Sequence, residues 1–268
     1  MLKRTLTALG LLLVGFPVLL WGGVPYLVVF GFLVTASAWE YTQIVQVSGS
    51  RPAGWLVIAG VIAILVTRFF QPQSAVVVFG AIVFVVMVYH LLDYERGAQH
   101  SGMDFSVSLG GVVYLGWMGG YLMDLRLLEN GGWWVMLILP CVWLADTGAY
   151  MLGAAYGRHR MTPRLSPKKT WEGFAAGVFT SMISGAFFAY AYSTWGPLHL
   201  SVPAGAGLGL LLGLLTPLGD LGESMLKRQS GMKDSGNLFP GHGGAFDRID
   251  SWIWAAAIGY YLVTWFYR

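Results

Sequence analysis

One stretch of the chain, residues 224–250, gathers residue types that bind an anion together with its metal. It reads SMLKRQSGMKDSGNLFPGHGGAFDRID, in a chain of which only 11% is charged. Its basic side chains could bind phosphate oxygens, its carboxylates a cation, and its glycines could offer backbone N–H groups to a phosphate. The glycine spacing is not that of a P-loop, so a P-loop NTPase is excluded. His242 could be a structural hydrogen-bonding group or a proton carrier.

Four aspartates, Asp146, Asp220, Asp247 and Asp250, lie within or at the ends of apolar stretches. Ionisable groups at such depth are costly and usually functional. Asp247 and Asp250 are three residues apart at the start of a predicted helix, so they share a face, although one of them could simply cap that helix. Carboxylates from two helix ends, in a chain with a single cysteine, favour a hard cation such as Mg²⁺.

Basic residues form two sets. The segment 157–172 is strongly basic, and its adjacent Lys168 and Lys169 directly precede an apolar run. The second set is Lys227 and Arg228. Such lysines could attract anionic lipid head groups at the membrane surface. Two basic sets facing a group of carboxylates would also suit a polyphosphate bound with its metal.

The elements that must position these residues are membrane-spanning helices. Hydrophobic residues make up 56% of the chain, and apolar runs near the ~20 residues needed to cross a bilayer recur along it. The runs are apolar on all sides, unlike amphipathic helices of a soluble domain, and lack the alternation of a β-barrel. We therefore expect an all-α, polytopic transmembrane helical bundle of about nine spans, at residues 5–20, 24–39, 53–70, 74–92, 106–125, 133–156, 173–195, 202–219 and 247–266.

The distribution of basic residues predicts the orientation of these spans. A cytoplasmic N-terminus and an outside C-terminus place most lysines and arginines on the cytoplasmic side. We expect one integrated membrane domain, with spans 1–5 in residues 1–130 and a catalytic region, spans 6–9, in residues 131–268. Cytoplasmic loops are predicted at 157–172 and 220–250, and a further polar loop at 40–52. The glycine-rich fifth span suits close helix packing, inside the bundle or in a homodimer.

The stretch 224–250 resembles the signature of the phosphatidate cytidylyltransferases, also called CDP-diacylglycerol synthases. The matching positions run from Ser224 through Lys227-Arg228 and Phe239-Pro240 to Asp247-Arg248-x-Asp250. Two upstream segments, Asp-Thr-Gly-Ala-Tyr at 146–150 and Ser-Pro-Lys-Lys-Thr-Trp-Glu-Gly at 166–173, are similar to that family in the same order. The resemblance is specific over residues 140–260 and general over the N-terminal half. Ala245 departs from it, because the family usually has a larger aliphatic residue there.

The resemblance implies a reaction in phospholipid biosynthesis, in which CTP and phosphatidic acid give CDP-diacylglycerol and pyrophosphate with Mg²⁺. Whether a second, monovalent cation assists is left open. The implied partners are CTP, phosphatidic acid and membrane lipids, with no nucleic acid. The implied location is a bacterial-type inner (plasma) membrane, with the active site facing the cytoplasm.

The resemblance also implies roles for individual residues. Metal ligands would be Asp220 and Asp247, with Asp250 and Asp146 near them. Catalytic residues would be Asp220, Asp247, Lys168 and Lys169. The substrate-binding set would comprise Ser224, Lys227, Arg228, Lys233, His242, Gly243, Gly244 and Arg248.

Elementary chemistry fits this reaction. The attacking group would be a phosphate monoester, which is largely dianionic at neutral pH, so that a strong general base is unnecessary. The main obstacle is repulsion between two anions, which a metal and basic side chains offset.

Two other functions remain open. In a CTP-dependent lipid-alcohol kinase the acceptor would be a hydroxyl that needs a base, and His242 would become the candidate. A transporter would place its charges near mid-bilayer in broken helices, whereas here the charges gather at one end of the spans, and we find no internal repeat.

Overall fold

The computed structural model describes residues 2–241 and 243–267. Apart from one short two-stranded sheet, its regular elements are helices, which confirms the all-α prediction. The chain forms two compact units that do not follow chain order. The first unit comprises residues 1–124 and 226–249, and the second comprises residues 125–225 and 250–268. Residues 226–249 thus belong to the same unit as the N-terminal helices, and the division near residue 130 within one membrane domain stays a prediction.

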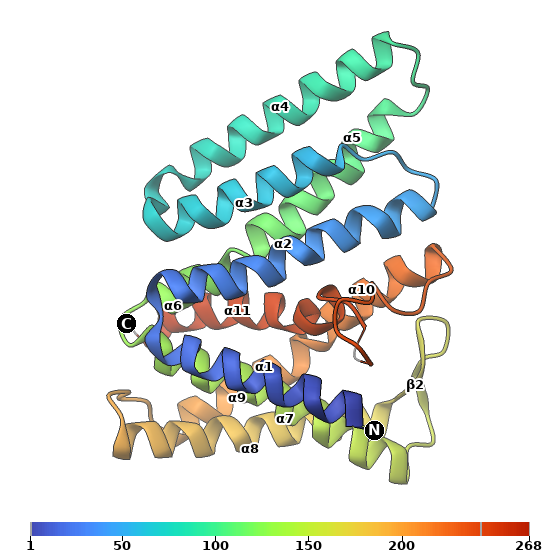
Figure 1. Cartoon of the computed structure of the whole chain (residues 1–268). Helices are drawn as coiled ribbons and strands as arrows, with labels where there is room; N and C mark the ends of the chain where they lie inside the picture. The colour runs from blue at the N-terminus through green and yellow to red at the C-terminus, as the bar shows by residue number, and fades with distance from the viewer. Residues whose placement is uncertain (1, 242, 268) are drawn as a thin grey trace. The chain divides into compact units, whose positions relative to one another are not determined.

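The first unit is built mainly from the N-terminal helices. Its elements are α1 (Leu2–Trp21), α2 (Gly23–Val47), α3 (Gly54–Phe70), the 3₁₀ turn η1 (Pro72–Ser74), α4 (Ala75–Glu95), α5 (Ser101–Gly111) and the π-helix η2 (Val112–Met118). Helix α3 packs between α2 and α4, and α4 packs on α5 (Figure 1). A Cβ atom at Gly111 would lie 2.7 Å from the ring of Tyr41. Glycine therefore lets α2 approach this glycine-rich stretch closely, as the sequence predicted.

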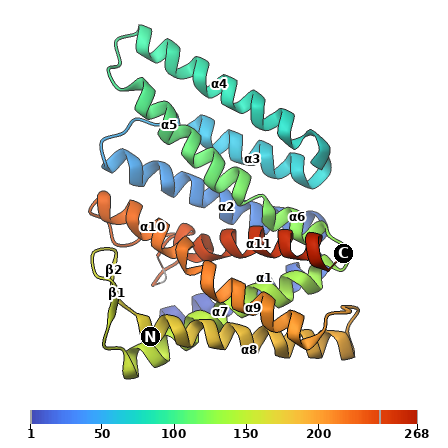
Figure 2. The same cartoon turned by 180° about the vertical axis from the view of Figure 1, so that it is seen from behind.

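The second unit contains three helices that lie side by side, α7 (Gly131–Tyr156), α8 (Trp171–Trp195) and α9 (Val202–Leu215) (Figure 2). Their backbones touch. A Cβ atom at Gly173 would lie 2.8 Å from the Ala149 carbonyl oxygen, and one at Gly209 would lie 2.2 Å from that of Ser181. These helices are thus held together through small residues. The chain passes between the two units within α6 (Tyr121–Leu127), α10 (Pro217–Gln229) and α11 (Phe246–Phe266).

Three predicted loops differ in the structure. Helix α2 continues through Glu40 to Val47, so the polar loop expected at 40–52 begins later; this continuation is possible because Glu40 and Thr42 are buried with hydrogen-bond partners. The expected loop 220–250 shrinks to 230–245, between α10 and α11. The apolar helix does break near Pro217, but this proline starts a new helix, as proline favours the first helical position.

The basic segment 157–172 also has regular structure. Strands β1 (Arg160–Thr162) and β2 (Ser166–Thr170) pair antiparallel. The Thr170 hydroxyl then accepts a hydrogen bond from the Gly173 N–H at 3.2 Å and caps the start of α8. Lys168 and Lys169 therefore lie in a strand directly before the start of α8, and not in an irregular loop.

Long apolar helices confirm the prediction of a polytopic membrane protein. Among the described residues, six stretches are long and apolar enough to cross a bilayer: Gly23–Val47, Pro72–Glu95, Ser101–Leu127, Gly131–Tyr156, Trp171–Trp195 and Val202–Gln229. Helix α3 is apolar but shorter. The count of nine spans and the sides on which the termini lie remain predictions.

Candidate active site

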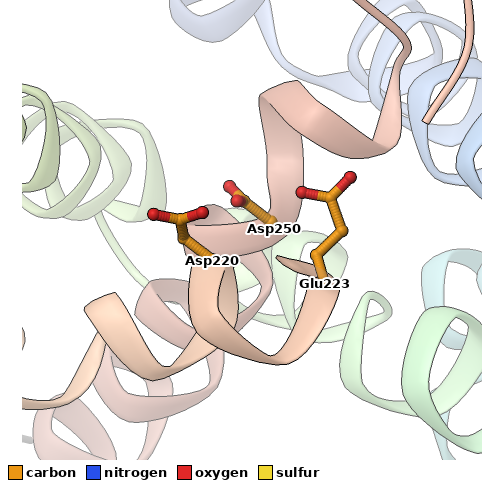
Figure 3. A group of neighbouring side chains, drawn as sticks. All are labelled: Asp220, Glu223 and Asp250. Carbon is orange, nitrogen blue, oxygen red and sulfur yellow. The ribbon is translucent and has the colours of Figure 1, made fainter. Parts of the chain in front are cut away.

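A group of three carboxylates lies in the second unit. Asp220 and Glu223 are one turn apart on α10, and Asp250 comes from α11; a carboxylate oxygen of each lies within 4.8 Å of the other two. Figure 3 shows the three side chains turned toward the same space. Glu223 is 1% exposed and Asp250 is 9% exposed. Asp220 is partly exposed. Carboxylates at this separation repel one another unless a cation or a proton neutralises their charge, and oxygen donors are the ligands that Mg²⁺ prefers.

A close helix contact holds this carboxylate group together. A Cβ atom at Gly219 would lie 2.5 Å from the carbonyl oxygen of Asp250 and 2.7 Å from the ring of Trp254. Any side chain at position 219 would therefore push α10 away from α11. Asp220 itself lies in the first turn of α10, where the helix dipole favours negative charge, and it accepts a hydrogen bond from the Ser224 hydroxyl at 3.3 Å.

A cavity of about 620 Å³ opens beside Asp220 within the same unit. Its charged lining residues are Asp146, Arg160, Lys168, Lys169 and Asp220. Lys169 forms an ion pair with Asp220. Much of the remaining lining is small or apolar, including Tyr150 and Phe174, and the volume lies in the usual range for small-molecule sites. The structure thus brings together the predicted acids Asp146 and Asp220 with the predicted lysines.

Asp247 has a different environment, in the first unit. Its Oδ1 accepts from the Lys227 ammonium at 2.5 Å, and its Oδ2 accepts from the backbone N–H groups of Gly244 and Ser235, each at 2.8 Å. The side chains of Lys227 and Asp247 are each 8% exposed. Lys227, expected to contact a phosphate, therefore forms a buried ion pair. Asp247 does not belong to the carboxylate group found among the described residues, and a metal site shared by Asp220 and Asp247 stays a prediction.

The other predicted residues of the signature lie in the loop between α10 and α11 or beside it. A hollow of about 690 Å³ in the first unit is lined by Lys233, Asp234, Asn237, Phe239, Pro240, Gly241, Gly243 and Arg248. Arg228 donates a hydrogen bond to the Met232 carbonyl oxygen at 3.2 Å, which ties the last turn of α10 to the loop that follows it. His242 lies outside the described residues, so its role stays a prediction. The predicted cations Lys233 and Arg248 thus share one hollow.

Two residues were missed by reasoning from the sequence. Glu223 lies beyond the predicted apolar run, which ends at Gly219, although its spacing of three residues from Asp220 repeats that of Asp247 and Asp250. Glu40 was assigned to a loop. It is buried in α2, and its carboxylate accepts hydrogen bonds from Ser235, Ala245 and Phe246, near the start of α11. No local sequence signal connects positions 40 and 245.

The chain is similar to known proteins over nearly its whole length. The sequence model of the cytidylyltransferase family matches residues 2–266. A phosphatidate cytidylyltransferase of Synechocystis sp. is 33% identical, over 98% of this chain and 96% of its own. Another, of Staphylococcus aureus (strain COL), is 34% identical over 93% of this chain and 94% of its own. A third, of Mycobacterium bovis, is 34% identical over 80% of this chain and 74% of its own.

These matches extend well beyond the signature and include the N-terminal helices, for which the motifs gave only a general likeness. They confirm the resemblance inferred from the three motifs. The chain belongs to the cytidylyltransferase family.

Proposed function

We propose that this protein transfers the cytidylyl group of CTP to phosphatidic acid. An oxygen of the lipid phosphate would form a bond to the α-phosphorus of CTP, and the bond from that phosphorus to the oxygen leading to the β-phosphorus would break. The products are CDP-diacylglycerol and pyrophosphate. The observation that carries the proposal is the similarity to relatives named phosphatidate cytidylyltransferase over more than nine-tenths of the chain.

The second unit supports this chemistry with both kinds of charge that the reaction needs. Asp220, Glu223 and Asp250 would hold Mg²⁺, which supplies the positive charge that offsets repulsion between the two phosphate groups. Lys168, Lys169 and Arg160 line the adjoining cavity, where they would bind phosphate oxygens and orient them. The lipid phosphate is already an anion near neutral pH, so it can attack without a side chain that removes its proton.

The cavity also suits a substrate with an apolar part. Tyr150, Ala154, Met161 and Phe174 line it together with the basic side chains, so a charged head group and the beginning of an acyl chain could both be accommodated. We place this site at the cytoplasmic side of a bacterial inner membrane, because the basic segment 157–172 follows the positive-inside pattern. CTP would enter from the cytoplasm and the lipid from the inner leaflet.

The test is incubation of the purified protein with phosphatidic acid, Mg²⁺ and CTP labelled at either the α- or the γ-phosphate. We expect the α-label in CDP-diacylglycerol and the γ-label in pyrophosphate. Transfer of the γ-label to the lipid would instead indicate a CTP-dependent kinase. Absence of the α-label from the lipid fraction, with folded protein, would contradict the proposal.

A further inference from the structure

Glu40 in α2 contacts a segment about two hundred residues away in the sequence. Its Oε1 accepts from the backbone N–H of Ala245 at 2.9 Å, and its Oε2 accepts from that of Phe246 at 2.9 Å. The Ser235 hydroxyl lies 2.8 Å from the same Oε2. Glu40 is 1% exposed, and all of these residues belong to the first unit. The carboxylate is therefore not an exposed surface charge; it binds the loop between α10 and α11.

The N–H groups that Glu40 binds occupy a special position. They lie at the start of α11, where a helix leaves its first N–H groups without partners inside the helix. A capping side chain from the same chain segment usually binds them. Here a carboxylate from another helix does so, at the helix end where the dipole favours negative charge. Because the carboxylate is buried, losing these donors would be costly, so the contact fixes both partners.

The same contacts reach Asp247. Ser235 lies between the two acids, with its hydroxyl 2.8 Å from Glu40 Oε2 and 2.9 Å from Asp247 Oδ2. Gly244, whose N–H donates to Asp247, directly precedes Ala245, whose N–H donates to Glu40. A displacement of the Glu40 carboxylate would therefore shift the backbone groups that orient Asp247.

Glu40 also explains two glycines of the signature. A Cβ atom at Gly236 would lie 2.5 Å from Glu40 Oε1, and one at Gly244 would lie 2.3 Å from Glu40 Oε2. Neither glycine has the positive φ that would itself require glycine, unlike Gly241 and Gly243. At Gly236 the Glu40 carboxylate therefore excludes a side chain, and at Gly244 it does so together with the Ser235 hydroxyl, which would also lie 2.3 Å from a Cβ atom.

We propose that Glu40 is a positioning residue for the reaction, which acts by holding the loop 235–246 and the first turn of α11 in the arrangement that orients Asp247. The inference rests on the proposed function, and it gives the N-terminal half of the chain a part in that function. Glu40 itself contacts protein groups and is not placed against substrate.

The first test compares Glu40→Gln with Gly236→Ala. Glutamine has nearly the shape of glutamate but only one acceptor oxygen, so its NH₂ group would oppose an N–H or hydroxyl donor. Alanine at 236 keeps Glu40 and displaces its carboxylate. In both variants we expect kcat to fall about 10- to 100-fold, because a small displacement of the groups at a reaction site slows the reaction by this much. KM for CTP and phosphatidic acid should change little. Asp104→Asn is the matched control, because Asp104 is equally buried in the first unit and binds the Arg51 N–H instead.

Hydrogen exchange gives a readout that does not depend on turnover. We expect faster amide exchange in peptides covering 235–247 in both variants, and unchanged exchange in α3 and α4. Wild-type kcat and KM in both variants, or faster exchange spread over the whole first unit, would overturn the proposal. If wild-type protein shows no cytidylyl transfer, the proposed function fails, while the exchange measurement still decides whether Glu40 holds the loop.

The double variant Glu40→Ala/Gly236→Ala gives the sharpest result. The three atoms nearest to a Cβ at Gly236 all belong to Glu40. Alanine at 236 should therefore cost no further activity once the Glu40 side chain has been removed, a clear departure from additivity. Additive losses of activity would contradict the proposal, because they would mean that Gly236 acts independently of Glu40. Should Glu40→Gln fail to fold, hydrogen exchange in peptides covering 235–247 of Gly236→Ala still tests the proposal.

Discussion

Aspartates are used in two different ways in this molecule. In the second unit, Asp220 and Asp250 lie with Glu223 in a group of three carboxylates, and Lys169 pairs with Asp220. In the first unit, Asp247 accepts hydrogen bonds from Lys227, Ser235 and Gly244 and lies in an ion pair. The first arrangement brings three carboxylates to one place, whereas in the second a single carboxylate is paired with a lysine.

We interpret the first arrangement as a cation site and the second as a fixed ion pair that holds the signature loop and the start of α11 in place. Carboxylates that lie this close together repel one another, and such groups are common where a cation is bound. Asp247 is held in one orientation by a lysine and two backbone donors, so it fixes the loop and the start of α11 relative to each other. Acids that are only three residues apart in the sequence, Asp247 and Asp250, can therefore have different tasks.

The largest effect is expected in the carboxylate group. Asp220→Asn and Glu223→Gln should each lower cytidylyl transfer by about 10³-fold, because a bound metal ion contributes several kcal/mol of charge stabilisation. Steady-state assays with CTP and phosphatidic acid measure this loss. Glu129→Gln is the control, as Glu129 is an exposed acid of the second unit. Activity within a few-fold of wild type in both variants would remove these residues from the site.

The next largest effect is expected on the stability of the fold, which substitutions in the two regions should change by different amounts. Asp247→Asn should destabilise the fold by about 3 kcal/mol, because it removes one partner of a buried ion pair. Asp220→Asn should lower the melting temperature less, because the ion pair that it breaks, with Lys169, is only partly buried. Thermal unfolding of the purified variants without divalent cations gives both values. The comparison between the regions fails if Asp220→Asn is the more destabilising change.

A smaller effect should follow from moving the helices that carry the carboxylates. Alanine at position 219 would contact the Asp250 carbonyl oxygen and separate α10 from α11. We expect Gly219→Ala to raise the Mg²⁺ concentration needed for half-maximal activity about 10-fold, with kcat at saturating Mg²⁺ less affected. Gly207→Ala in α9 is the matched control, because a Cβ atom there meets nothing within 4 Å. An equal response of the two variants would speak against the helix contact.

The helices and the family motifs could be predicted from the sequence because both are local. Apolar runs revealed the long helices and the position of Asp220 at the end of one run, and the motifs contain Asp250, Lys168 and Lys169. A helix that continues through polar residues, such as α10, leaves no apolar run in the sequence, and Glu223 was missed for this reason. Glu40 was missed because its partners lie about two hundred residues further along the chain, and periodicity carries no information about contacts at that separation.

The most direct measurement of the central claim is divalent cation binding to the carboxylate group, followed with Mn²⁺ by electron paramagnetic resonance in the absence of substrates. Wild-type protein should bind Mn²⁺, and Glu223→Gln should weaken this binding at least 10-fold. Asp247→Asn, in protein that remains folded, should weaken it much less. Equal Mn²⁺ affinity in wild type and Glu223→Gln, or a larger loss in Asp247→Asn, would contradict the assignment of the cation to Asp220, Glu223 and Asp250.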